Sequence, residues 1–384
     1  MSQHRLDKLA HLLERVEPLD RIPPGFELRD VDYTSRADAV AYFADTRVKD
    51  RGTIIATTGD NWARSARVRV PYGLEANYLP LGQGAVGIKV ERFPIRRYPP
   101  FVLYPDGEVK PLRAVAPRAP DNDDEILGLD IYRLFGGLPV DPGDNLRTDG
   151  DGSQGIWGVD VEAAEAFPIP GSPLGEVRQG VAGRDGAVMS VAGYRGGVGA
   201  GVWRYGTSTD RGRSWERSDV SLPLRRKYLW RYAEAMHAAG PGHLQAIAMS
   251  DWGVDTPPSL RELWWTDDEK AFRRVSLPWN ELRFGGMAFT PDGALLVAEV
   301  TGSEHYGIQS STSRPGRIWR LASNDAAPTL LTGAPELFGP FWAVGIQASG
   351  GWIVARTGMR TIALSKDGRS WAQVTPGQQQ VKQP

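Results

Sequence analysis

The stretch Ser208-Thr209-Asp210-Arg211-Gly212-Arg213-Ser214-Trp215 decides the fold class of this chain. Its Asp carboxylate can accept hydrogen bonds from the backbone N–H groups of a tight turn, and its Gly permits a positive φ. The Trp that follows can cover the turn with its ring. A shortened copy, Ser365-Lys366-Asp367-Gly368-Arg369-Ser370-Trp371, and a degenerate copy, Thr266-Asp267-Asp268-Glu269-Lys270-Ala271-Phe272, stand further along the chain. Three turns of one kind predict a repeated β-hairpin.

The repeat that carries these turns has a common order of elements. Each copy has an apolar strand, a turn with Gly, a second apolar strand, a long loop, a Trp-rich strand and a last strand that often ends at Pro. The first turns centre on Gly186, Gly242, Gly293 and Gly350, which lie 56, 51 and 57 residues apart by subtraction of their numbers. A period of roughly 50 residues fits four-stranded blades better than helical repeats.

We therefore predict an all-β fold, a single β-propeller of about seven four-stranded blades, with six or eight as alternatives. A short helix precedes it, because Leu6, Leu9, Leu13 and Val16 recur at helical spacing and Pro18 stops the pattern. The predicted boundaries are residues 1–18 for the helix, 19–376 for the propeller and 377–384 for a polar tail. The blades are expected at residues 177–223, 232–278, 287–335 and 342–376, over 77–112 around Pro105-Asp106-Gly107, near Thr53-Ile54-Ile55-Ala56, and over 127–170.

The stretch at residues 208–215 resembles the Asp box of the sialidases and other Asp-box propellers. In that family the box joins the third strand of a blade to the outer strand and lies away from the catalytic face. The resemblance implies that binding residues come from the opposite loops, which join second to third strands and one blade to the next. The expected ligand-binding residues are Arg195, Arg226, Arg231, Asp251, Trp252, His305, Arg314, Arg356 and Arg360, and the same reasoning selects Asp60 with Asn61 and Trp62.

The same resemblance supplies a candidate chemistry. Family sialidases hold a sugar carboxylate with three arginines, use a Tyr activated by a Glu as nucleophile, and use an Asp as acid/base. Arg21-Ile22-Pro23 is similar to the early family motif, Glu299 and Arg314 to the later Glu and second Arg, and Arg356 or Arg360 to the third Arg. The candidate catalytic residues are Glu299, Tyr306 and Asp60. The sequence departs from the family because Tyr306 is the last tyrosine, whereas the family nucleophile lies on a later blade.

Composition limits the partners, the location and the cofactors that we expect for this chain. The net charge is −1 and there are no cysteines, so no global field recruits nucleic acid and no thiolate chemistry is available. The only dense basic stretch, residues 224–231, fits a solvated blade connection as well as a phosphate contact, and we expect no nucleic acid and no membrane partner. The location is expected to be cytoplasmic. No cofactor is expected; Asp149 and Asp151 are weak calcium candidates, and a plain Asp/Gly turn is the alternative.

Two functions follow from these residues. The leading one is a rigid binding scaffold that presents a site for a protein partner, or for a small or carbohydrate ligand, on the face opposite the Asp boxes. The alternative is a sialidase-like glycoside hydrolase or lyase that acts on a carbohydrate or a small carboxylate-bearing substrate. The sequence leaves open whether the chain is an enzyme.

Overall fold

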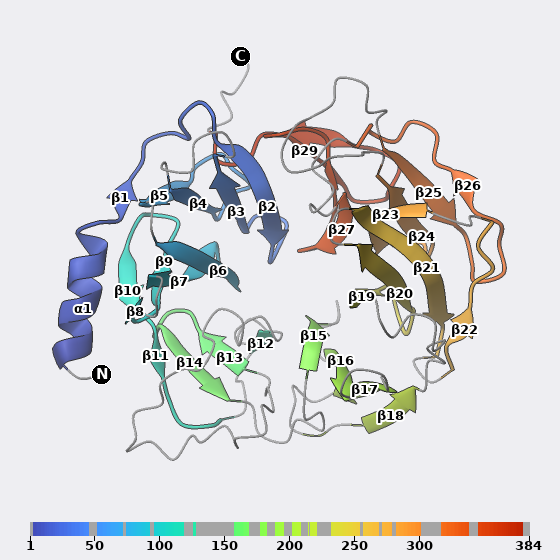
Figure 1. Cartoon of the computed structure of the whole chain (residues 1–384), viewed down its shortest axis with the longest axis horizontal. Helices are drawn as coiled ribbons and strands as arrows, with labels where there is room; N and C mark the ends of the chain where they lie inside the picture. The colour runs from blue at the N-terminus through green and yellow to red at the C-terminus, as the bar shows by residue number, and fades with distance from the viewer. Residues whose placement is uncertain are drawn as a thin grey trace. The chain divides into compact units, whose positions relative to one another are not determined.

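The computed structural model is an all-β chain with one short helix, shown in Figure 1. It describes residues 3–45, 52–71, 74–92, 96–118, 126–127, 157–168, 177–182, 189–195, 202–208, 214, 216–220, 232–253, 256–268, 271–278, 282–300, 316–337 and 345–378. Within these ranges, hydrogen bonds join the strands into six sheets, one of which has eight strands and contains two groups of four. We therefore number seven sheets in chain order, each with four main strands, and the first two of them have a short fifth strand.

The first three sheets occupy the N-terminal part of the chain. Sheet 1 has β2 (Glu27–Tyr33), β3 (Ala39–Ala44), β4 (Thr53–Thr58) and β5 (Ala66–Val70), with β1 (Glu17–Pro18) beside β5. Sheet 2 has β6 (Glu75–Gly82), β7 (Ala85–Arg92), β9 (Phe101–Leu103) and β10 (Val109–Pro111), and β8 (Arg96–Arg97) pairs with β7. Sheet 3 has β12 (Ile126–Leu127), β13 (Trp157–Asp160), β14 (Glu165–Pro168) and β11 (Arg113–Ala114).

The remaining sheets follow the same pattern. Sheet 4 has β15 (Val177–Ala182), β16 (Met189–Arg195), β17 (Val202–Ser208) and β18 (Glu216–Val220). Sheet 5 has β19 (Tyr232–Ala239), β20 (Gln245–Gly253), β21 (Thr256–Thr266) and β22 (Arg273–Arg274), and sheet 6 has β23 (Leu282–Phe289), β24 (Leu295–Glu299), β25 (Arg317–Leu321) and β26 (Thr329–Leu330). Sheet 7 has β27 (Ile346–Ser349), β28 (Trp352–Arg356), β29 (Ile362–Ser365) and β30 (Ala372–Val374).

The predicted fold class is confirmed in its all-β character, its four-stranded antiparallel sheets of the propeller-blade type and its short N-terminal helix. Three of the predicted turn glycines, Gly242, Gly293 and Gly350, have positive φ and each lies between the first and second strand of its sheet. Gly186 lies outside the described residues. Pro105-Asp106-Gly107 forms the predicted hairpin, in which the Tyr104 N–H donates to Glu108 O at 2.9 Å.

Two features of the strand pairing were not predicted. In sheet 3 the fourth strand comes from the segment before the sheet, because β11 pairs with β14 in parallel. In addition, β21 continues beyond sheet 5 and pairs with β23, through Ser259 with Arg283 and Leu260 with Leu282. This pairing joins sheets 5 and 6 along the chain.

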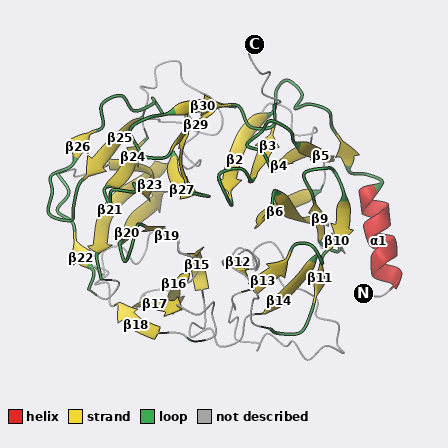
Figure 2. Ribbon diagram, turned by 180° about the vertical axis from the view of Figure 1, so that it is seen from behind, coloured by secondary structure: helices red, strands yellow, loops and turns green. Residues whose placement is uncertain are grey.

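The chain forms two compact units, which are described separately. Unit 1 comprises Met1–Tyr194, Arg204–Arg217 and Thr375–Pro384, and unit 2 comprises Arg195–Trp203 and Ser218–Val374. In unit 1, α1 (Gln3–Leu13) is coloured red in Figure 2. Its Leu9 and Leu12 are buried against apolar residues of sheets 1 and 2, whereas Leu6 is exposed. The helix therefore covers these sheets through positions 9 and 12.

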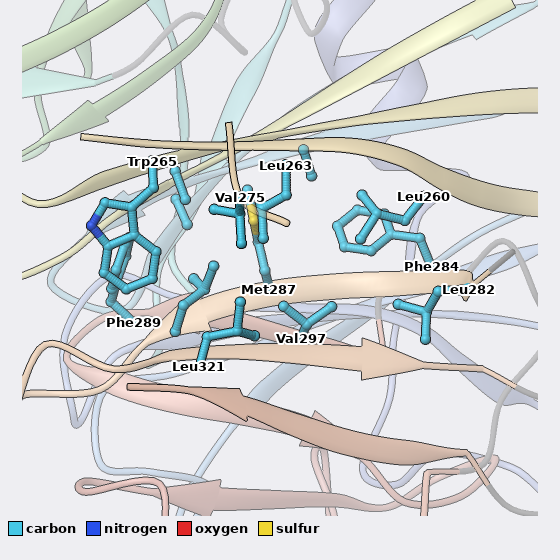
Figure 3. Packing of buried hydrophobic residues seen from close by; sticks show 14 residues of the cluster. Leu260, Leu263, Trp265, Val275, Leu282, Phe284, Met287, Phe289, Val297 and Leu321 are labelled. Atoms are coloured by element: carbon cyan, nitrogen blue, oxygen red, sulfur yellow. The ribbon is translucent and has the colours of Figure 1, made fainter. Parts of the chain in front are cut away.

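The core of unit 2 lies between sheets 5 and 6, as Figure 3 shows. Leu263 and Trp265 of β21 meet Met287 and Phe289 of β23, and the rings of Trp265 and Phe289 contact edge to face at a centroid distance of 4.9 Å. Alternation of side chains along each strand places these residues on one face. The other face of sheet 6 packs on sheet 7 through a second apolar cluster that includes Ala298 and Ala355.

Candidate functional site

Each sheet has two ends, and the Asp turns identify one of them. We call the end with the first-to-second and third-to-fourth strand turns the turn edge, and the opposite end the loop edge. At the turn edge of sheet 7, Asp367 Oδ1 accepts hydrogen bonds from the N–H groups of Arg369 and Ser370, each at 2.8 Å, and Gly368 has a φ of +74°. Asp268 of sheet 5 accepts from Thr266 Oγ1 and from the Ala271 N–H, each at 2.8 Å. These contacts are of the kind that the sequence predicts for residues 266–272 and 365–371, whereas residues 209–213 and 215 of the first stretch lie outside the described residues.

Hydrogen bonds lower the pKa of two carboxylates at the turn edges, Asp367 and Asp292. Hydrogen bonds from the backbone N–H groups of Ser370 and Arg369 lower the pKa of Asp367 to about 2. At the turn edge of sheet 6, Asp292 accepts from the Thr290 hydroxyl and, through Oδ2, from Arg320 and Arg369, each at 3.0 Å. The Thr290 hydroxyl is the main cause of a lowered pKa of Asp292. Because Arg369 belongs to sheet 7, Asp292 links two neighbouring sheets of unit 2.

Asp60 lies at the turn edge of sheet 1. The prediction that it belongs to the opposite loops is therefore corrected. Because β2 and β3 precede it, β4 is the third strand of sheet 1, so residues 59–65 form a third-to-fourth strand turn. Asp60 Oδ1 accepts from Thr58 Oγ1 at 3.0 Å and from the Arg64 N–H at 2.7 Å, while Oδ2 pairs with Arg64 Nε at 2.9 Å. Asp60 therefore builds a turn like those of Asp268 and Asp367.

Asn61 and Trp62 belong to the same turn. Trp62 is fully buried, and its Nε1 donates to the Tyr33 hydroxyl at 2.9 Å. That hydroxyl donates to Asn61 Oδ1 at 3.0 Å, and burial raises the pKa of Tyr33 above its ordinary value. These side chains fix the turn from within and are not presented to a ligand.

Glu299 lies at the loop edge of sheet 6, at the end of β24. Its Oε2 accepts a hydrogen bond from Trp319 Nε1 at 2.9 Å and lies 3.5 Å from Arg317 Nε. The register explains the contact, because Glu299 pairs with Arg317 across the two strands and Trp319 lies two residues further on the same face. The Glu299 side chain is 20% exposed and that of Arg317 is 51% exposed.

Arg356 and Arg360 lie at the loop edge of sheet 7, as predicted for residues between second and third strands. Arg356 ends β28 and is buried, and its N–H donates to Gly345 O at 3.0 Å. Gly345 N–H in turn donates to Gly285 O at 2.5 Å, so sheets 6 and 7 meet here through backbone atoms. A Cβ at position 285 would lie 2.4 Å from Val300 Cγ1, which explains the need for Gly.

Arginines outnumber acidic residues at this combined edge. The described charged residues at the loop edges of sheets 6 and 7 are Arg283, Arg317, Arg356, Arg360, Glu299 and Glu336. We call the four arginines the strand-end arginine group. Arg283 is the second residue of β23 and is exposed. Among the described residues, this edge has four arginines and two glutamates, so positive charges exceed negative ones by two.

The other predicted residues divide into two sets. Arg195 lies in β16, and Asp251 and Trp252 lie in β20 rather than in a loop, paired with Ala233 and Tyr232. Strand β20 extends further than predicted because β21 continues to pair with it. The second set lies outside the described residues: Arg226, Arg231, His305, Tyr306, Arg314, Asp149 and Asp151.

A phenol and carboxylate pair in unit 1 was not selected from the sequence. The side chain of Tyr78 in β6 forms a hydrogen bond with that of Asp30 in β2. Its ring stacks on the ring of Tyr42, with 5.4 Å between the centroids. Burial, together with the charges of Asp30 and Asp32, raises the pKa of Tyr78 well above its ordinary value. The phenol therefore keeps its proton, which is the opposite of an activated nucleophile. The two aspartates at alternate positions of one short strand, Asp30 and Asp32, are the sequence signal that could have drawn attention to this site.

Neither a metal cluster nor a membrane span is found in the described part of the chain. No group of three or more His, Cys, Asp or Glu residues there could hold an ion, and α1 is too short and too polar to cross a bilayer. The basic side chains of the loop edge have the chemistry that suits an anion.

Comparisons with solved structures find similar chains at low sequence identity. No family model and no curated protein matches this chain. The GH74 xyloglucanase from Xanthomonas campestris is 13% identical with a TM-score of 0.48, and the alignment covers 95% of this chain but 56% of the xyloglucanase. The phage phi92 endosialidase is 11% identical, with 91% and 64% of the two chains covered and a TM-score of 0.40. YCF48 bound to D1 peptide is 12% identical, with 94% and 84% covered and a TM-score of 0.30.

Proposed function

We propose that the chain is a rigid binding scaffold that holds an anionic group of a ligand or protein partner at the loop edges of sheets 6 and 7. The strand-end arginine group is the observation that carries this proposal. Arginine binds carboxylate and phosphate through a planar fork of N–H donors, and it is enriched where interfaces gain their binding energy. Arg283 of β23 and Arg317 of β25 are both exposed, and their strands lie on either side of β24 in one sheet.

The enzyme alternative places acid/base chemistry on Glu299. Its Oε2 is already engaged by Trp319 and Arg317, so the carboxylate has a clear structural role. A general acid or base must reach the reacting proton within hydrogen-bond distance. Asp60, the second candidate, is committed to its own turn. These contacts favour binding over catalysis.

The test uses two double variants with the same change of charge. Arg283→Glu/Arg317→Glu alters the loop edge of sheet 6, and Arg273→Glu/Lys366→Glu alters exposed residues at the turn edges of sheets 5 and 7. Each immobilised protein is incubated with native lysate, and bound species are quantified at low and at physiological salt. We expect at least one species to be retained by the wild type and the turn-edge variant but depleted about tenfold on the loop-edge variant.

Equal retention by both variants would contradict the proposal. The enzyme alternative is tested in parallel with a panel of glycosides, sialosides and uronate-containing polysaccharides. Turnover that the wild type shows and that Glu299→Gln loses, while the fold is intact, would establish the enzyme instead of the scaffold.

A further inference from the structure

A buried arginine in unit 1 joins two distant segments of the chain. Arg67 lies in β5 and is 6% exposed. Its Nε donates to Gly377 O at 2.7 Å, and its Nη1 donates to Asp20 O at 2.9 Å. A buried guanidinium needs such acceptors, because an uncompensated charge in the interior is strongly unfavourable. The carbonyls of residues 20 and 377 therefore serve as partners for one cation.

The segment that reaches Arg67 is a preformed turn. The Gln378 N–H donates to Thr375 O at 3.4 Å, Pro376 is the second residue, and Gly377 has a φ of +70°. Pro at the second and Gly at the third position are the residues that a type II turn requires. The residues of Thr375-Pro376-Gly377-Gln378 thus favour the turn that the structure shows, and we call this segment the Pro-Gly turn.

The surface beneath this turn is apolar and closely fitted. Pro376 and Gly377 are both buried. A Cβ on Gly377 would lie 3.1 Å from Ile22 Cγ1 and 3.3 Å from Phe43 Cζ, so only glycine fits without displacing the neighbours. The site thus combines two apolar side chains, Ile22 and Phe43, with one buried arginine that donates a hydrogen bond to a backbone carbonyl.

We propose that sheet 1 carries a peptide-binding site for the Pro-Gly turn, occupied by the chain's own residues 375–378, and that the same site accepts this turn from a separate peptide when the covalent copy is released. The inference is independent of the loop-edge binding proposed above, because none of its residues belongs to the strand-end arginine group. The site anchors the chain directly after β30, its last described strand. Because the covalent copy has an effective concentration on the order of mM, it excludes weaker competitors until it is displaced.

The first experiment measures whether Arg67 holds the turn in the full-length protein. The chain has no cysteine, so Gln378→Cys, at an exposed position, gives a unique site for a nitroxide label. We expect a slow, restricted spectrum in the parent and a fast one after Arg67→Met. Arg69→Met is the matched control, since Arg69 lies on the same strand and pairs with Glu17 instead. Equal label mobility in the parent and in Arg67→Met would overturn the proposal.

The second experiment measures binding of a separate peptide. A fluorescent peptide of residues 375–384 is titrated to mM concentration into wild-type chain, Gly377→Val chain and Gly377→Val/Arg67→Met chain, after circular dichroism shows that each is folded. We expect at least tenfold tighter binding to the Gly377→Val chain than to the wild type, and loss of binding in the double variant. Equal binding to all three, or binding to none, would overturn the proposal.

Discussion

Replacement of Glu299 separates a structural carboxylate from a catalytic one. In Glu299→Met the Trp319 indole N–H loses the acceptor that lies 2.9 Å away, and Arg317 loses its ion pair. A hydrogen bond to a charged group contributes about 1.5–3 kcal/mol. The ion pair adds about 0–1 kcal/mol, because Arg317 is half exposed. We expect Glu299→Met to lower the free energy of unfolding by about 2–3 kcal/mol.

Glu299→Gln should be much milder, because its amide oxygen can still accept from Trp319. We expect a loss of about 0.5–1.5 kcal/mol, close to that of Arg317→Met. Urea unfolding followed by far-UV circular dichroism measures all three variants without relying on the fluorescence of 13 tryptophans. If Glu299→Met costs no more than Arg317→Met, the Trp319 hydrogen bond does not stabilise sheet 6, and the case against a catalytic Glu299 fails.

Three further predictions concern the turn edges. Asp292→Asn should cost about 1–2 kcal/mol in urea unfolding, less at 1 M salt, because the pairs with Arg320 and Arg369 are partly exposed; a cost that does not change with salt would contradict this. The lowered pKa of Asp367, about 2, means that its stabilising effect is complete above about pH 5 and is lost as pH falls toward 2, so Asp367→Asn should flatten acid unfolding in that range. Asp60→Ala should cost about 1–2 kcal/mol and leave ligand retention unchanged, and loss of retention in a folded variant would restore Asp60 as a site residue.

The regular part of the fold could be predicted from glycine and proline. Gly242, Gly293 and Gly350 are visible in the sequence because a tight first turn needs positive φ, and each begins a hairpin in the structure. The pairing of β11 with β14 was not visible, because a two-residue strand has no alternation to detect. The link from β21 to β23 likewise depends on how long one strand continues, which tertiary contacts decide.

The site residues were harder to predict because residue type does not reveal partners. Glu299 was selected because it is similar to the later Glu of the sialidases, yet its environment comes from Arg317 and Trp319, which strand register places beside it. Arg283 was missed because a single arginine at the start of a strand carries no pattern of its own. Tyr78 was missed because its partner Asp30 belongs to another sheet.

Asp60 shows why an apparent functional residue can be a structural one. Thr58, Asp60 and Arg64 use the same atoms as Thr266, Asp268 and Ala271: a hydroxyl donates to Oδ1, and a backbone N–H further on donates to the same oxygen. In Asp60 and Asp292 the second oxygen, Oδ2, pairs with arginine. In Asp60 and Asp292, therefore, one carboxylate oxygen stabilises the turn and the other pairs with a cation. An acidic residue that follows a Ser or Thr by two positions should therefore be assigned to a turn before it is considered for catalysis.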